Sequence, residues 1–169
     1  MSDVAELAAR LVEIESINPD IVAGGSGEAA VAHFVAEWCE RAGLETTLSE
    51  PAPRRPNVIA VARGSGGGRS LMLNAHMDTV GVAGVADPFT PRVESGRLFG
   101  RGAYDMKGSL AACMLATAEA VRLSLPGDVV LTAVADEEFA STGTEAVAAS
   151  LSADAAIVTE PTELQVAVA

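Results

Sequence analysis

Three short apolar segments of this sequence each run directly into side chains that can bind a metal ion or transfer a proton. The segments and the polar residues that follow them are 71–75 with His76 and Asp78, 129–135 with Asp136, Glu137 and Glu138, and 155–159 with Glu160. In open α/β sheets, ligands bind in the crevice beyond the carboxyl ends of the strands. If the three segments are neighbouring strands, we expect these polar groups to meet at one place.

The gathered carboxylates would repel one another in a partly buried crevice unless a cation lay between them. Asp105, at the start of a buried helix predicted over 106–122, would join them. Imidazole and carboxylate ligands suit Zn²⁺, and a carboxylate shared by two ions gives the close metal pair used in hydrolysis. His-x-Asp triplets and Glu-Glu pairs are each weak evidence alone. Their shared position after a strand predicts a metal site.

The hydrophobic pattern alternates between the strand and helix periods along the chain. The predicted helices are 4–14, 28–41 with Gly43 as its stop, 106–122 and 144–150, and the predicted strands are 44–48, 57–61, 70–75, 128–135, 154–158 and 164–169. A proline-rich turn over 51–56 separates the first two strands, and a long loop follows His76. Alternating strands and helices predict an α/β fold with a mostly parallel central sheet flanked by helices.

Composition excludes several classes of protein. Of the 169 residues, 49% are hydrophobic and 20% charged, with a mean hydropathy of +0.30, which excludes disorder. The net charge is 11 − 23 = −12, with no basic cluster for nucleic acid or an anionic membrane. The N-terminus has no signal-peptide pattern, and the most apolar stretch, 110–118, is too short to span a bilayer. We expect a cytoplasmic protein in which Cys39 and Cys113 are buried free thiols.

Other candidate sites are weaker. Residues 64–70 are glycine-rich but lack the lysine of a phosphate loop, so they predict a hairpin turn. His33 lies on the polar face of a predicted helix and is expected to be solvated. The serines have no Gly-x-Ser-x-Gly setting, which argues against a serine hydrolase. A glycosidase with paired carboxylates would leave His76 unexplained.

Four ordered motifs resemble those of the co-catalytic zinc metallopeptidase family that contains acetylornithine deacetylase, succinyl-diaminopimelate desuccinylase, aminoacylase-1 and glutamate carboxypeptidase. The motifs are Leu73–Val80, the run from Asp87-Pro88-Phe89 to Gly96–Gly108, Asp136–Glu138, and Glu160–Thr162. The block Gly-Arg-Gly-x-x-Asp-Met-Lys-Gly most resembles the deacetylase and desuccinylase branch. The resemblance covers most of the chain.

The resemblance implies a role for each matching residue. His76 and Glu160 would bind one zinc ion, Glu138 would bind a second, and Asp105 would bridge the two. Asp78 would lie behind His76, and Glu137 would be the general base that takes a proton from the attacking water. The implied cofactors are two Zn²⁺ ions, with Co²⁺ or Mn²⁺ as possible substitutes.

The implied activity is removal of the acyl group from an N-acyl amino acid. A carboxypeptidase or dipeptidase of the same family, acting on a short peptide, is the alternative, as is a non-catalytic binding module that keeps the fold. The family also needs a second histidine ligand, whereas the sequence holds only His33 and His76. We therefore expect residues 1–169 to be an inactive N-terminal portion of the catalytic domain. The rest of that domain and a lid or dimerisation domain would lie outside it, in a homodimeric parent protein.

Overall fold

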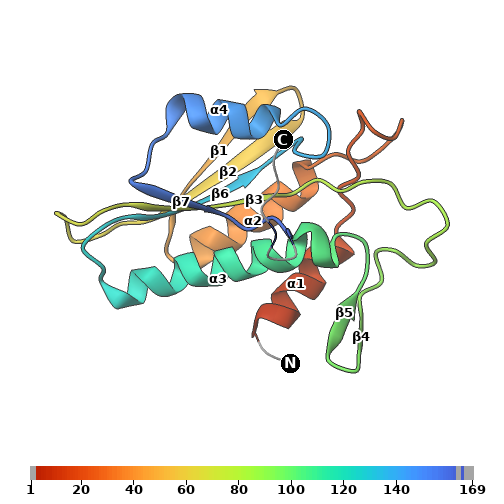
Figure 1. The fold of residues 1–169 in the computed structure, drawn as a ribbon, viewed down its shortest axis with the longest axis horizontal. Helices are drawn as coiled ribbons and strands as arrows, with labels where there is room; N and C mark the ends of the chain where they lie inside the picture. Colours follow the sequence, from red (N-terminus) through yellow and green to blue (C-terminus); the bar gives the residue numbers. More distant parts are fainter. Residues whose placement is uncertain (1–2, 163–164, 166–169) are drawn as a thin grey trace.

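A central sheet with helices on both faces forms the body of the protein in the computed structural model, which describes residues 3–162 and 165 (Figure 1). The helices are α1 (Asp3–Glu13), α2 (Ala29–Arg41), the one-turn π-helical segment η1 (Ala103–Lys107), α3 (Gly108–Leu123) and α4 (Thr142–Ser150). The strands are β1 (Glu45–Ala52), β2 (Arg55–Ala62), β3 (Leu71–His76), β4 (Arg92–Glu94), β5 (Arg97–Phe99), β6 (Val129–Val134) and β7 (Ala155–Val158).

The five-stranded sheet has the order β1-β2-β6-β3-β7. Strands β6, β3 and β7 run parallel, with Leu73 opposite both Leu131 and Ile157. Strands β1 and β2 pair antiparallel, because a tight turn at Pro53-Arg54 joins them and reverses the chain. Strand β2 also pairs antiparallel with β6. The predicted α/β fold is confirmed, and the parallel part of the sheet is the part that carries the polar strand ends.

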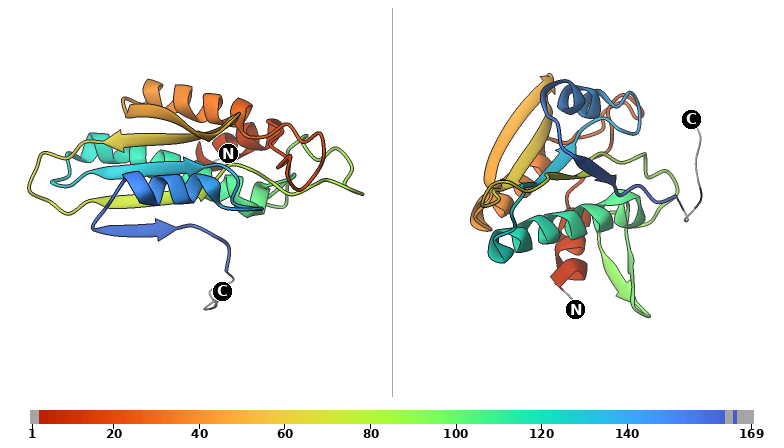
Figure 2. Two further views of the ribbon diagram at one scale, coloured as in Figure 1. Left: turned by 90° about the horizontal axis from the view of Figure 1, so that it is seen from above. Right: turned by 60° about the vertical axis from the view of Figure 1, so that its left-hand side comes forward.

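The helices form two unequal layers. Figure 2 shows α1, α2 and α3 on one face of the sheet and α4 on the other. The larger layer buries alternate strand residues such as Val58, Leu73 and Leu131 against the helices. Helix α3 was predicted to be buried, and the structure buries one of its faces, with Leu110 and Met114 inside, while its other face is exposed.

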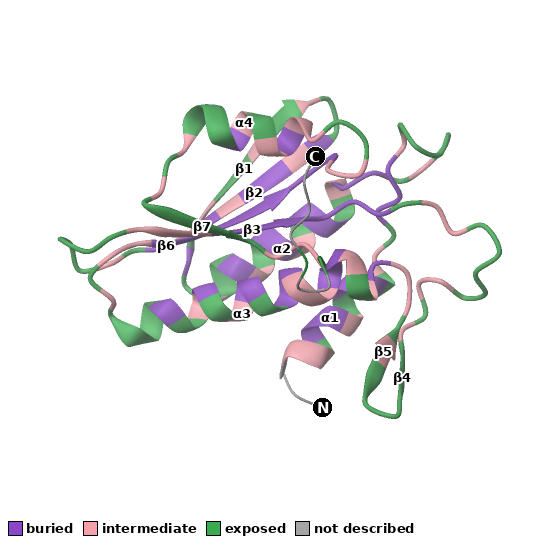
Figure 3. Ribbon diagram, in the orientation of Figure 1, coloured by how far each residue is buried: buried purple, intermediate pink, exposed green. Residues whose placement is uncertain are grey.

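Burial differs sharply between the central strand β6 and the edge strand β7, as the colours of Figure 3 show. All six residues of β6 are buried, because β6 lies between two strands and under helices on both faces. All four residues of the edge strand β7 are exposed. Cys39 and Cys113 are buried free thiols, as predicted. Within the described residues, no helix is long and apolar enough to cross a membrane.

The structure differs from the local predictions for the long loop and for residues 64–70, and it leaves the predicted strand 164–169 almost entirely undescribed. The predicted long loop contains the β4–β5 hairpin, whose turn at Ser95-Gly96 uses two left-handed residues with φ of 51° and 76°. Residues 64–70 are not a hairpin turn: they join β2 to β3, which β6 separates in the sheet. They pack instead against the Pro126-Gly127 turn, where Gly68 N–H donates to Pro126 O at 3.1 Å. The predicted strand 164–169 lies outside the described residues except Gln165.

Candidate metal centre

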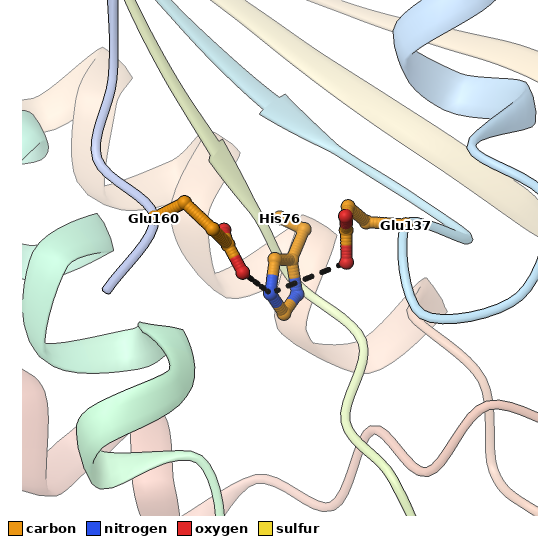
Figure 4. A group of neighbouring side chains, drawn as sticks. All are labelled: His76, Glu137 and Glu160. Carbon is orange, nitrogen blue, oxygen red and sulfur yellow. Dashed lines mark ion pairs between the residues drawn. The ribbon is translucent and has the colours of Figure 1, made fainter. Parts of the chain in front are cut away.

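Three parallel strands deliver polar side chains to one end of the sheet. His76 is the last residue of β3, the middle one of these three strands. Glu137 follows β6, and Glu160 follows β7 (Figure 4). The imidazole is 1% exposed, and its Nε2 lies 3.8 Å from Glu137 Oε2 and 3.7 Å from Glu160 Oε1. The strand order therefore brings together three groups that are up to 84 positions apart in the sequence.

Asp105 reaches the same nitrogen from a different layer. Its Oδ1 lies 3.0 Å from His76 Nε2. Asp105 does not open α3 as expected, because its φ and ψ of −124° and 99° are not helical and α3 begins at Gly108. The irregular segment η1, rather than the regular start of a helix, places this carboxylate over the strand ends.

Two overlapping sets of side chains have the composition and spacing of a metal site. In each set, the three ligand atoms all lie within 4.8 Å of one another: His76, Glu137 and Glu160 form one, and His76, Asp105 and Glu138 the other. Imidazole and carboxylates are ligands that suit Zn²⁺, so the donor set fits the ion expected from the sequence. Spacing alone does not separate Glu137, the expected base, from the expected ligands.

Asp78 lies behind His76 and is completely buried. The backbone carbonyl of Asp78 accepts a hydrogen bond from His76 Nδ1 at 3.0 Å, which leaves Nε2 facing the carboxylates. The Asp78 side chain accepts the backbone N–H groups of Glu137 and Glu138, at 3.0 and 3.1 Å. Although burial opposes ionisation, hydrogen bonds from His76 and Asn18 outweigh it and hold the pKa of Asp78 below its usual value.

The electrostatics of the cluster favour additional positive charge. Burial, aided by the charges of Asp105, Glu137 and Glu138, raises the pKa of Glu160 to about 7 despite the opposing effect of His76. Burial also raises the pKa of Glu138. Burial alone would lower the pKa of His76, but Asp78, Glu160 and Glu137 outweigh it and raise that pKa to about 9. A divalent cation would supply the charge that bound protons otherwise provide.

A cavity of about 250 Å³ adjoins the cluster on the side of α4. His76, Glu137 and Glu160 contribute to its wall, and the rest is mainly apolar, including Met72 and Val147. His33 is exposed on α2, in agreement with its prediction as a solvated residue.

Sequence reasoning missed the residues that surround Asp136, the residue before Glu137. Asn18 lies after the predicted helix 4–14, Glu28 begins the predicted helix 28–41 and Arg55 lies in the predicted turn 51–56, and none of them was assigned to the site. The structure buries all three beside the polar strand ends. A charged residue at the start of an apolar strand was the available signal for Arg55, but no spacing rule linked it to Glu28 or Asn18.

Comparison with known proteins agrees with this geometry. Residues 72–169 match the model of Peptidase family M20/M25/M40, which is more than half of the chain. The chain belongs to this family. The predicted relationship to a family of metallopeptidases and deacylases is thereby confirmed.

Three relatives at or above 33% identity are named as deacylating enzymes. They are N-formyl-4-amino-5-aminomethyl-2-methylpyrimidine deformylase of Halalkalibacterium halodurans (36% identity, 79% of this chain and 33% of the relative), succinyl-diaminopimelate desuccinylase of Leptothrix cholodnii (36%, 98% and 44%) and acetylornithine deacetylase of Proteus mirabilis (33%, 95% and 43%). The chain thus spans between a third and a half of the length of these relatives.

Solved structures share the fold. An M20 metallo-carboxypeptidase from Sulfolobus solfataricus superimposes with a TM-score of 0.77 at 24% identity, over 94% of this chain and 37% of the other. A Bacillus subtilis protein described as a dinuclear metal binding peptidase gives 0.63 at 16% identity, over 86% and 38%. At these identities the likeness concerns the fold.

Proposed function

We propose that the full-length protein containing residues 1–169 hydrolyses the amide bond of an N-acyl amino acid, using two zinc ions. The observation that carries this proposal is the convergence of His76 with Asp105, Glu137, Glu138 and Glu160 beside three strand ends. The sequence relatives favour a deacylase over a peptidase, because the three relatives named above, at 33–36% identity, carry deacylase names. The peptidase likenesses lie at 24% identity or below and concern the fold.

In this proposal His76, Asp105 and Glu160 hold one zinc ion, and Asp105 and Glu138 hold the other. When bound, the ions supply Lewis acidity, which polarises an amide carbonyl and makes water a stronger acid. Asp78 keeps His76 Nδ1 occupied, so that Nε2 is the nitrogen offered for binding.

Glu137 is the proposed general base. Its carboxylate takes a proton from the attacking water and passes it to the leaving amine nitrogen as the C–N bond breaks, while the water oxygen enters the product carboxylate. The backbone N–H of Glu137 is held by Asp78, so its side chain extends from a fixed point. Glu138 is its neighbour in the same turn, and the two carboxylates take separate roles.

We also propose that residues 1–169 are the N-terminal portion of a catalytic domain whose second histidine ligand comes from outside them. The sequence holds only His33 and His76, and His33 is exposed on α2. A lid or dimerisation domain, implied by the family resemblance, belongs to the same proposal, and the chain spans only 33–44% of the length of its relatives.

The test combines metal content with a substrate panel, using the full-length protein. Zinc bound after dialysis should fall sharply in His76→Ala and stay unchanged in the matched control His33→Ala. N-acetyl, N-succinyl and N-formyl amino compounds should be hydrolysed faster than dipeptides. Faster hydrolysis of dipeptides would favour the peptidase alternative, and bound zinc without any turnover would favour the non-catalytic module.

A further inference from the structure

The turn that carries Glu137 and Glu138 has a backbone that needs support. Asp136 is the first residue of this turn and Ser141 the last, and both are in the left-handed region, with φ of 64° and 54°. Residues with a Cβ are disfavoured there, so surrounding contacts must hold them. The positions of the two glutamates therefore depend on whatever fixes Asp136.

Asp136 is held by groups from three distant parts of the chain and by Thr142, the first residue of α4. Its carboxylate accepts hydrogen bonds from Arg55 Nη2 at 2.9 Å, Asn18 Nδ2 at 3.0 Å and Thr142 Oγ1 at 2.7 Å. Its backbone N–H donates to Glu28 Oε1 at 3.1 Å. Asp136 is 3% exposed, so few water molecules compete for these bonds.

Arg55 supplies the positive charge of this network. It is 7% exposed, and its Nε lies 2.7 Å from Glu28 Oε2 while its Nη2 contacts Asp136. Glu28 is completely buried. Two buried carboxylates are therefore paired with one planar guanidinium, whose fork can contact both at once, as a lysine could not.

Asn18 extends the network to the metal centre. Its amide nitrogen donates both to Asp136 and to Asp78 Oδ2, the latter at 2.7 Å. Its amide oxygen accepts the backbone N–H of Asp20 at 2.9 Å, which fixes the orientation of the amide and directs both N–H donors to the carboxylates. Without this donor, two buried carboxylates would face each other with nothing between them.

We propose that Asn18 and Arg55 are positioning residues that act as one unit on the metal centre. The contacts run from Arg55 to Asp136, then through Asn18 to Asp78. Asp78 in turn holds the backbone of Glu137 and Glu138 and contacts His76. Neither positioning residue belongs to the sets of groups that could hold the metal, so each sets the geometry of the centre through others. The inference rests on the proposed function only for its kinetic readout.

The test uses Asn18→Asp and Arg55→Lys in the full-length protein, singly and together. Asn18→Asp keeps the acceptor for Asp20 but loses the two N–H donors, and Arg55→Lys keeps the charge but loses the fork. Changes in groups that orient metal ligands typically cost about 10- to 100-fold in metal affinity or activity. We expect each variant to show a loss of that size in kcat, with KM changed little, and an altered visible absorption spectrum with Co²⁺.

Because the two residues act as one unit, the double variant should lose little more than either single variant. Arg63→Lys is the matched control: Arg63 also pairs with two carboxylates, at 2.8 Å each, but its side chain is 59% exposed, and its variant should behave as wild type. Should Arg55→Lys fail to fold, Thr142→Val removes only one half-buried donor to Asp136 and should give a smaller loss of the same kind.

A lower melting temperature with wild-type kcat and an unchanged Co²⁺ spectrum would overturn the proposal, because the network would then be purely structural. Losses that multiply in the double variant would overturn it as well, since the residues would then act independently. If the wild-type protein hydrolyses none of the substrates, the proposed function fails. The Co²⁺ spectra of the variants then test the positioning role without kinetics. A spectrum altered from that of the wild type supports the role, and an unchanged spectrum refutes it.

Discussion

Glu137→Gln separates proton transfer from metal binding at this centre. Glutamine has nearly the size of glutamate but takes up no proton at neutral pH, so the substitution removes the proposed base and little else. The backbone N–H of residue 137 stays bound to Asp78 Oδ1 at 3.0 Å, because that bond does not involve the side chain. The turn is therefore expected to keep its conformation.

The expected cost of this substitution follows from the role assigned to Glu137. A positioned general base contributes about 10²- to 10⁴-fold, which corresponds to about 2.7–5.4 kcal/mol of transition-state stabilisation. Removing one carboxylate 3.8 Å from His76 Nε2 also relieves repulsion, because the charge of Glu137 helps to raise the pKa of Glu160 to about 7. Folding stability should therefore be unchanged or slightly increased, and zinc content should be unchanged because Glu137 is not one of the proposed ligands.

The assay measures kcat on the best substrate of the panel and zinc by elemental analysis, in the full-length protein. Glu119→Gln, an exposed glutamate on α3, is the matched control and should retain wild-type kcat. Loss of zinc in Glu137→Gln would refute the reasoning. It would mean that Glu137 binds the metal with His76 and Glu160, a set that the spacing of these groups also permits.

Three further outcomes follow from the structure. Glu138→Ala should lower zinc content and kcat together, as elemental analysis and activity will show; full zinc content with lost activity would exchange its role with that of Glu137. Leu131→Ala removes a fully buried side chain between the sheet and helices and should cost about 2.7–5 kcal/mol in urea unfolding, whereas Leu123→Ala, 59% exposed, should cost less than about 0.5 kcal/mol. Burial raises the pKa of the Cys39 thiol to about 12, so the reactive thiolate is scarce below that pH. A thiol reagent at pH 8 should therefore label Cys39 only after unfolding. Rapid labelling of the native protein would contradict the burial of Cys39.

Local sequence pattern was enough to predict most elements and the polar groups at the strand ends. A run such as 129–134 is apolar except for Thr132 because β6 is buried on both faces, and the polarity changes abruptly at Asp136, where the strand has ended. The helix end at Gly43 was equally local: Gly43 has φ of 84°, a conformation that glycine adopts readily. The β4–β5 hairpin was missed because its strands are only three residues long and too short to show a period.

The position of Asp105 was predicted only in part. Its place before a helix was clear from the apolar run that follows it, but the irregular backbone of η1 was not. That backbone depends on contacts with distant groups, including the hydrogen bond from Lys107 Nζ to Ile14 O at 2.6 Å. Such contacts leave no periodic trace in the sequence.

By itself, the sequence determined which groups could do chemistry: one histidine and several carboxylates, which follow apolar strands except for Asp105 before a helix. Tertiary structure decided that they meet. In the sheet, β3 lies between β6 and β7, so His76 at the end of β3 lies between Glu137 after β6 and Glu160 after β7. It also decided that Asn18 and Arg55 support the centre. Hydrogen bonds between residues that are 60 to 118 positions apart depend on how the chain packs, and no local pattern of side chains specifies them.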